Sequence, residues 1–304
     1  MLLFEYAIIK NIIKLHMSKI TKKIKTFQTK VKTFFSLLFS QRIAKKEAWM
    51  YLYKMTRYAL GQIFAYSGIG EYISFSVRGE YRLYLTKSPV AMVAFGDPTA
   101  TRDEEHIAKD ILHEGDICLD IGSNIGNFSL CAASLVGEMG QIFTFEAHPR
   151  TYMYAEKNIK LNKISSISLF KFAVGEKEGT ISFSDDLYDD VNHVQEHGGV
   201  MVPMIKLDDC EELKNLSSIT CMKIDIEGYE LYALRGAVET LKKTKYVLFE
   251  LYEKSALLYG HHADDVYSFL SSQGFEIVDP KTRIPFDKKF LRKDTIQNLL
   301  AVRK

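Results

Sequence analysis

The sequence predicts an α/β fold in which a mostly parallel sheet is covered by helices on both faces. From residue 117 onward, short apolar runs alternate with longer segments of helical periodicity, the pattern of repeated βα units. Seven of these runs have the length of a strand, and they span residues 117–121, 141–146, 167–172, 219–226, 246–251, 275–278 and 298–302. Seven strands fit one doubly wound domain.

An insertion interrupts the alternation between the third and fourth runs. Residues 175–206 contain two further strand-like pieces, 180–184 and 200–205, on either side of an acidic loop that contains histidines. The insertion is long enough to form a structure of its own beside the sheet.

The N-terminal side of the domain has elements of a different kind. An aromatic-rich segment over residues 45–66 predicts a helix, and two alternating runs, 72–78 and 81–86, predict a hairpin about Gly79. Three consecutive acidic residues then open a helix over residues 103–113. We interpret the hairpin as an accessory cap.

The formal net charge of +2 conceals a strong asymmetry along the chain. Residues 1–46 hold eleven basic residues and one acidic residue, a net charge of about +10, which leaves about −8 on the remaining 258 residues. The basicity therefore belongs to an N-terminal extension.

This extension has the pattern of one amphipathic helix. At about 100° per residue, seven apolar side chains between Ile20 and Leu38 fall on one side and the lysines on the other. Such a helix suits an anionic membrane surface, and we place that contact in residues 9–39. The alternatives are packing against the rest of the chain or a partner protein, and binding to nucleic acid.

The compartment follows from what the sequence lacks. No stretch approaches the roughly 18 uncharged apolar residues of a membrane-spanning helix, and Glu5, Lys10 and Lys14 interrupt the one candidate signal peptide. Four cysteines show no metal-ligand spacing and are expected as buried free thiols: Cys118, Cys131, Cys210 and Cys221. We predict a cytoplasmic protein, with the inner face of a membrane as the place of any peripheral binding.

The most specific segment is a buried strand that leads into a glycine turn and then a helix. Such a turn brings backbone close to a ligand at the carboxyl end of a sheet. A dinucleotide site needs G-x-G-x-x-G, but here only Gly122 and Gly126 are present, with Asp120 two residues before the first. A carboxylate there repels a phosphate and suits a cation. The charge favours S-adenosylmethionine, which carries an ammonium and a sulfonium and no phosphate, over NAD.

A second acidic residue, Glu146, lies 24 residues beyond Gly122 at the end of the next predicted strand. A carboxylate at that place can accept hydrogen bonds from both hydroxyls of a ribose. Alone, Glu146 has an ordinary interpretation as a strand-end carboxylate. Together with Asp120 and the glycine turn on consecutive βα units, it predicts a nucleoside-binding site.

Over about residues 103–302 the chain resembles the FkbM-type methyltransferases. Five motifs carry the resemblance in order: D-I-G-S-N-I-G at 120–126, F-E-A-H-P at 145–149, A-V-G at 173–175, K-I-D-I-E-G-Y-E at 223–230 and N-L-L-A at 298–301. The resemblance implies a class I methyltransferase fold with strand order 3-2-1-4-5-7-6 and an antiparallel strand 7. It also implies methyl transfer from S-adenosylmethionine, commonly to an oxygen.

The resemblance also assigns residues to the cofactor. The methionine end would be held at the glycine turn by Asp120, Gly122, Ser123, Asn124 and Gly126. The ribose would be held by Glu146 at the end of the second strand, and the adenine would lie beside Phe172 and Ala173 at the end of the third. Two positions depart from the family pattern. Ser123 replaces a more usual alanine, a small change, whereas Phe172 replaces a polar residue and can stack on adenine without hydrogen bonding to it.

Charge, the pattern of elements and the resemblance together divide the chain into three parts. A basic helical extension spans residues 1–46, an accessory helix and hairpin span 47–102, and the methyltransferase domain spans 103–304.

Two carboxylates near the end of the fourth predicted strand are candidates for catalysis. Asp225 and Glu227 alternate by two, so both can project toward the cofactor. Methyl transfer requires an acceptor atom held in line within about 3–3.5 Å of the methyl group and a route for its proton. We predict that Asp225 or Glu227 positions and deprotonates an acceptor hydroxyl, with Glu250 as a third carboxylate. The alternative is that they cap the next helix and pair with Lys223.

Other candidates for the site are weaker. His193 and His197 in the insertion are alternative bases, although loop histidines are more often solvated. We interpret His261 and His262 as surface residues. No ligand set has convincing spacing for a metal, and none is predicted.

The leading prediction is an O-methyltransferase for a sugar, glycan or other small-molecule hydroxyl, with the acceptor recognised by the insertion and the hairpin. A lipid-linked sugar becomes more attractive if the basic helix lies on a membrane. One alternative is a non-catalytic module that binds the cofactor or recruits a partner, and another is N-methylation of protein. The net acidic domain argues against nucleic acid as the substrate.

Overall fold

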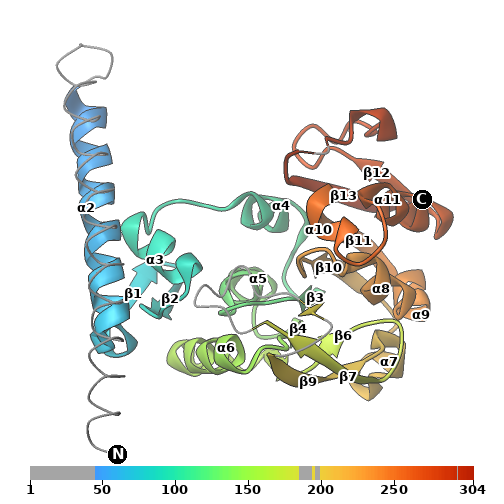
Figure 1. Ribbon diagram of the computed structural model, residues 1–304, viewed down its shortest axis with the longest axis horizontal. Coiled ribbons are helices and arrows are strands. Elements are labelled where there is room, and N and C mark those ends of the chain that lie inside the picture. Colours follow the sequence, from blue (N-terminus) through green and yellow to red (C-terminus); the bar gives the residue numbers. More distant parts are fainter. Residues whose placement is uncertain (1–44, 185–193, 196–198, 293) are drawn as a thin grey trace, which may run out of the picture.

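The computed structural model describes residues 45–184, 194–195, 199–292 and 294–304. The predicted basic helix within residues 9–39 and the loop histidines His193 and His197 lie outside these residues. Figure 1 shows a long helix, α2, along one side of the molecule and an α/β domain on the other, with a small hairpin between them.

The centre of the fold is a seven-stranded sheet in the order β12-β13-β11-β10-β3-β4-β5. In chain order its strands are β3 (Ile117–Ile121), β4 (Gln141–Phe145), β5 (Ile167–Phe170), β10 (Ile219–Ile224), β11 (Thr244–Leu251), β12 (Phe275–Val278) and β13 (Gln297–Arg303). Neighbours from β11 to β5 run parallel, whereas β13 is antiparallel to both β11 and β12. This order and the reversed strand confirm the class I methyltransferase fold.

Alternate residues of the central strands face two hydrophobic cores. Cys118 of β3 packs in one cluster, and Leu119 and Ile121 pack in the other. Strands buried on both faces have near-continuous apolar sequences, which is why the pattern predicted β3 correctly. Three helices pack on the first core: α4 (Asp103–Ile111), α5 (Asn127–Val136) and α6 (Pro149–Asn162). Four helices pack on the second core: α7 (Glu211–Lys214), α8 (Glu230–Arg235), α9 (Val238–Lys242) and α11 (Ala263–Ser272). The short helix α10 (Glu253–Leu257) follows β11.

The sequence after the fourth strand has the pattern of one helix over about residues 230–241, but the structure has two helices there, α8 and α9, so a single helix is the wrong prediction. A Cβ at Gly236 would lie 1.9 Å from the carbonyl oxygen of Gly175, so the chain bends where two backbones approach closely. Asp208 then accepts hydrogen bonds from two N–H groups in the first turn of α9, at 2.9 and 2.8 Å. This carboxylate caps the second helix.

The insertion forms a second sheet in the order β6-β9-β7-β8. Its strands are β6 (Ala173–Val174), β7 (Gly179–Phe183), β8 (Val194–Gln195) and β9 (Val200–Ile205). The strand predicted over residues 167–172 therefore ends at Phe170, because the chain leaves the main sheet and β6 pairs parallel with β9. The last cofactor residue of the prediction, Ala173, begins this second sheet.

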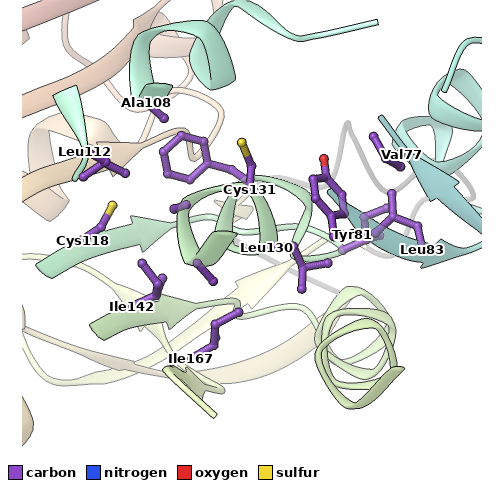
Figure 2. Close-up of a cluster of buried hydrophobic side chains, with 14 of the residues drawn as sticks. Val77, Tyr81, Leu83, Ala108, Leu112, Cys118, Leu130, Cys131, Ile142 and Ile167 are labelled. Carbon is purple, nitrogen blue, oxygen red and sulfur yellow. The ribbon is translucent and has the colours of Figure 1, made fainter. Parts of the chain in front are cut away.

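The N-terminal elements share the first core with the sheet. They are α2 (Lys45–Ser67), the short 3₁₀ helix η1 (Ile69–Tyr72), β1 (Ser74–Val77), β2 (Tyr81–Tyr84) and α3 (Pro89–Gly96). The hairpin is confirmed, with Arg78 and Gly79 at positive φ in its turn. Figure 2 shows Tyr81 and Leu83 of the hairpin packed beside Leu130 and Cys131 of α5.

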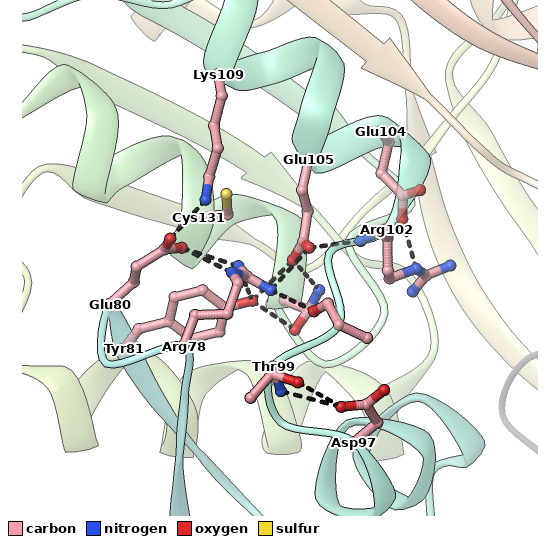
Figure 3. A network of polar contacts seen from close by, with 12 residues as sticks. Arg78, Glu80, Tyr81, Asp97, Thr99, Arg102, Glu104, Glu105, Lys109 and Cys131 are labelled. Atoms are coloured by element: carbon pink, nitrogen blue, oxygen red, sulfur yellow. Dashed lines mark hydrogen bonds and ion pairs between the residues drawn. The ribbon is translucent and has the colours of Figure 1, made fainter. Parts of the chain in front are cut away.

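A buried polar network ties the hairpin to α4 and α5 (Figure 3). Arg78, whose side chain is 9% exposed, forms ion pairs of 2.9 Å with Glu80 and 3.0 Å with Glu105. Glu105 is fully buried and also accepts hydrogen bonds from Tyr81 and Asn127, both at 2.8 Å. The accessory region is thereby fixed to the helix that follows the glycine turn.

All four cysteines are buried and free, as predicted. Cys118 and Cys221 lie opposite each other on the neighbouring strands β3 and β10. Burial raises the pKa of the Cys131 thiol to about 12 and that of Cys210 to about 11.

The Arg78 network predicts a large effect of a single substitution. Glu105→Leu leaves the guanidinium without its buried partner, and we expect a loss of about 3–5 kcal/mol in the free energy of unfolding, measured with urea. Asp103→Leu on the same helix removes an ion pair with Lys281 whose side chains are more than half exposed, and should cost less than about 1 kcal/mol. Equal losses in the two variants would contradict the assignment.

Candidate active site

A cavity opens where the carboxyl ends of β3, β4 and β10 meet. Eight of the ten predicted site residues line it: Gly122, Ser123, Asn124, Glu146, Phe172, Ala173, Asp225 and Glu227. The other two do not line it, because Asp120 is fully buried within β3 and Gly126 precedes the first residue of α5. Residues from four separate motifs therefore meet at one place.

Backbone contacts fix the glycine turn between two strands. Gly122 and Ser123 donate their N–H groups to the carbonyl oxygen of Phe145, at 2.9 and 3.2 Å, and Asp225 donates to that of Ile121 at 3.1 Å. Gly122 has a φ of 81°, and a Cβ there would lie 2.0 Å from the carbonyl oxygen of Asp225. Only glycine satisfies both the dihedral angle and the close approach.

The turn also carries a buried hydroxyl that lacks a partner. Ser123 is 4% exposed, and its Oγ makes no hydrogen bond with any described residue. Leaving such a group unsatisfied costs about 1–3 kcal/mol. Because Ser123 lines the cavity, a polar ligand atom there would remove that cost, and the residue fits a bound polar cofactor.

Glu146 is held by hydrogen bonds from three donors. One carboxylate oxygen accepts from the N–H of Asn124 at 2.7 Å, and the other accepts from His148 N–H at 2.9 Å and Thr151 Oγ at 2.8 Å. A carboxylate offers about four acceptor positions, so one good position is left for a ligand rather than the two that a pair of ribose hydroxyls would use. Burial raises the pKa of Glu146 to about 7, although all three hydrogen bonds lower it.

A lysine that we had not assigned to the site lies beside the predicted cofactor carboxylate. Lys223 is 6% exposed, and its Nζ lies 3.4 Å from Asp120 Oδ1 and 3.4 Å from Asp225 Oδ2. It also donates to the carbonyl oxygen of Gly122 at 3.4 Å. Asp120 receives a further hydrogen bond from Ser129 at 2.5 Å. The cation next to Asp120 is therefore one that the chain itself supplies.

The two predicted catalytic carboxylates both line the cavity, but not for the reason that the sequence suggested. The strand β10 ends at Ile224, and Glu227 has a φ of 55°, so alternation along a strand does not place them. The carboxylate that holds the loop before the next helix is a different one, Glu230. Glu230 accepts hydrogen bonds from the N–H groups of Ile226 and Gly228, both at 3.1 Å. The pairing of Asp225 with Lys223 at 3.4 Å matches that part of the alternative interpretation.

An apolar part of the cavity wall comes from the start of the insertion. Phe172, Ala173 and Val174 line it together with Phe183 of β7. This is the surface that the resemblance assigns to adenine. It offers stacking and burial rather than side-chain hydrogen bonds.

Several residues near the site escaped the sequence analysis. Ser88, just before α3, donates a hydrogen bond to Asn124 Oδ1 at 3.3 Å, and the Ser88-Pro89 pair is a helix-start signal that could have revealed α3. The surface interpretation of His261 was wrong, because it is 6% exposed and its Nε2 lies 2.9 Å from the carbonyl oxygen of Gly228. His262 has an exposed side chain that pairs with Glu253 at 2.7 Å.

No group of three or more histidine, cysteine or acidic residues in the described part of the chain has the geometry to hold a metal ion.

The sequence model of one protein family, the methyltransferase FkbM domain, matches residues 120–277. The chain belongs to the FkbM methyltransferase family. The matched segment begins at Asp120 and ends in β12, so it contains every residue of the cavity discussed above except those from the N-terminal elements.

Relatives with known names are distant. Hexuronic acid methyltransferase AglP of Haloferax volcanii is 26% identical over 156 residues, which cover 50% of this chain and 63% of that protein. The 2-O-methyltransferase NoeI of Sinorhizobium fredii is 26% identical over 174 residues, which cover 50% of this chain and 70% of that protein. A solved methyltransferase FkbM from Methylobacillus flagellatus is 15% identical, covering 90% of this chain and 58% of that one, with a TM-score of 0.41. This chain thus spans less than two thirds of the Haloferax relative.

The close approach at the turn can be separated from the cost of its dihedral angle. Gly122 and Gly115 have φ values of 81° and 85°, but a Cβ at Gly115 meets nothing within 4 Å. We expect Gly122→Ala to lower the free energy of unfolding by about 1–3 kcal/mol more than Gly115→Ala does, measured by urea unfolding. Similar values for both would show that the Asp225 loop moves away freely.

Proposed function

We propose that this chain transfers a methyl group from S-adenosylmethionine to a hydroxyl of a sugar or glycan. The observation that carries the proposal is the meeting, in one cavity, of the turn with its unsatisfied Ser123 hydroxyl, Glu146 and the Asp225 carboxylate. Family membership supports the reaction, and the names of the two relatives, a hexuronic acid methyltransferase and a 2-O-methyltransferase, support the acceptor class.

In this proposal the turn and its neighbours bind the cofactor. Gly122, Ser123 and Asn124 hold the methionine end, and Glu146 accepts one ribose hydroxyl in its remaining position. Asp120 and Gly126 act from beneath the turn, through Lys223 and through the start of α5. Phe172 and Ala173 flank the adenine. Bound here, the cofactor supplies an electrophilic methyl group on a sulfonium.

Asp225 then serves as the base for the acceptor hydroxyl. Its side chain is 30% exposed and lines the cavity, so an incoming hydroxyl can reach it. Lys223 holds one of its oxygens at 3.4 Å and orients the carboxylate. With the cofactor bound, the acceptor oxygen would form a bond to the methyl group as the bond from that methyl to sulfur breaks, which would leave S-adenosylhomocysteine, and the hydroxyl proton would pass to Asp225. Glu227 completes the wall beside it.

Cofactor binding should depend on the ionisation of Glu146. Since its pKa is about 7, the carboxyl takes up a proton as the pH falls from 8 to 6, and the protonated form is a poorer acceptor for a ribose hydroxyl. We expect the Kd for S-adenosylhomocysteine to rise by about tenfold over that interval, measured by calorimetry. Glu146→Gln should bind weakly at both pH values. A Kd that is flat in the wild type would remove Glu146 from the ribose site.

Catalysis should depend on Asp225 more than binding does. Asp225→Asn keeps the shape of the side chain and removes the base, so we expect kcat to fall by about 10²–10⁴-fold. The assay follows tritium transfer from labelled cofactor to glucuronic acid, glucose and N-acetylglucosamine glycosides. The Kd for S-adenosylhomocysteine should stay within about threefold of wild type. Unchanged kcat in this variant, with a loss in Glu227→Gln, would reassign the base to Glu227.

We also propose that the chain works at an anionic membrane surface. No helix in the described part of the chain is long and apolar enough to cross a membrane. However, the outward face of α2 carries exposed apolar and aromatic side chains, among them Trp49 at 69%, Tyr53 at 58% and Ile63 at 62%. This face directly follows the segment with a net charge of about +10. Aromatic residues beside basic ones suit the headgroup region of a bilayer.

Membrane binding can be tested by sedimentation with vesicles. The full chain should sediment with phosphatidylglycerol vesicles and remain in solution with phosphatidylcholine vesicles. The double variant Trp49→Asp and Tyr53→Asp should bind phosphatidylglycerol at least about fivefold more weakly. Met139→Asp replaces an apolar residue that is 74% exposed elsewhere and should bind as wild type. Equal binding of all three proteins would contradict a role for α2.

A further inference from the structure

A second, smaller cavity adjoins the proposed cofactor cavity. Its walls come from the start of α4 and from the carboxyl ends of β10 and β11, with one residue of β13. Four residues line both cavities: Arg102, Glu104, Lys223 and Asp225. The proposed base therefore stands between the two cavities.

Two half-buried polar side chains in the second cavity lack a hydrogen-bond partner among the described residues. Glu250 and Asn298 lie directly opposite each other on β11 and β13. Neither side chain makes a hydrogen bond or ion pair with any residue that the structure describes, although both line the cavity. Their neighbour in the wall, Asp225, is tied to Lys223. A carboxyl and an amide left unpaired at one point are the groups that a small polar ligand would satisfy.

The size of the cavity limits what it can hold. Its volume is about 50 Å³, and a cavity needs about 10–15 Å³ to hold one water molecule, so this one has room for a few water-sized groups. A whole sugar ring does not fit, but one or two hydroxyl groups at the edge of a ring do. The remainder of such a ring would lie in the larger cavity beside Asp225.

The charge of the cavity favours hydroxyls over anions. Burial raises the pKa of Glu250 to about 8, and the carboxylates of Asp225, Glu227 and Glu230 raise it further while Lys223 lowers it. At neutral pH the Glu250 carboxyl is mostly protonated and can both donate and accept hydrogen bonds, as a sugar hydroxyl can. The two cations in the wall, Arg102 and Lys223, are already paired with Glu104 at 2.6 Å and with Asp225 at 3.4 Å, so a phosphate or sulfate here would also face both carboxylates.

We infer that this second cavity is an acceptor subsite, in which Glu250 and Asn298 bind the hydroxyl next to the one that is methylated on a sugar ring. The inference rests on the proposed function and adds the location and chemistry of acceptor recognition. It makes Asn298 and Glu250 determinants of which vicinal diol is accepted. The hydroxyl that is bound in the small cavity places the adjacent hydroxyl, the one to be methylated, next to Asp225.

Saturation-transfer NMR on the full chain tests this subsite. With S-adenosylhomocysteine bound, the probes are methyl glucoside, methyl glucuronide and methyl N-acetylglucosaminide. At least one should receive saturation from the wild type, and Asn298→Ala and Glu250→Ala should each raise its Kd by about tenfold, the loss of one or two hydrogen bonds. Glu250→Gln should retain most of the affinity, because an amide also donates and accepts.

Controls separate this inference from the proposed function. Gln297→Ala, one residue along β13 and outside this cavity, should bind sugar as wild type. All variants should keep their thermal stabilisation by S-adenosylhomocysteine, which also shows that they fold. Sugar binding that survives both alanine variants would overturn the subsite and leave the proposed function standing. Binding of S-adenosylhomocysteine without binding of any of the three sugars would overturn the subsite and count against the sugar acceptor, and would leave the cofactor site standing. Failure of S-adenosylhomocysteine to bind the wild type would overturn both.

Discussion

One buried cation, Lys223, joins the glycine turn after β3 to the loop after β10 that carries Asp225. Its Nζ lies between Asp120 of β3 and Asp225 beyond β10, at 3.4 Å from each, and it reaches the backbone of Gly122. Desolvation opposes the charge of Lys223, but the two carboxylates more than compensate and raise its pKa above the usual value. Without this ammonium, a fully buried Asp120 would have no counter-charge, and the turn would lose its link to the loop that carries the proposed base.

The negative charges of the carboxyl groups around that loop are reduced or offset in different ways. Glu230 accepts two backbone hydrogen bonds, yet burial raises its pKa to about 7. Glu250 has a pKa of about 8 and makes no hydrogen bond within the described residues. Asp225 instead has the ammonium of Lys223 beside it. These three acidic residues can share one sheet edge, because protonation removes part of the negative charge and Lys223 offsets another part.

The sequence was sufficient where the signal is local and insufficient where it depends on distant contacts. The limits of β3 follow from burial on both faces, and the glycine turn from its spacing, so both could be predicted. The break at Gly236 depends on the backbone of Gly175, about 60 residues earlier, and no local pattern reveals it. The role of Lys223 depends on the register that places it opposite Asp120 on the next strand. The same limit applies to His261, which is buried by the turn at Gly228.

Because all four cysteines are buried, the folded protein should react slowly with thiol reagents. Cys118 and Cys221 lie on adjacent central strands, Cys131 lies in α5, and Cys210 directly precedes α7. A hydrogen bond with Cys221 and burial raise the pKa of Cys118, and burial raises the pKa of Cys131 and Cys210. A thiolate is the reactive form, so neither access nor ionisation favours alkylation at neutral pH. Alkylation therefore has to wait for the sheet or its helices to open. The rate at which a maleimide reacts with these thiols therefore measures how often the core that supports the site opens.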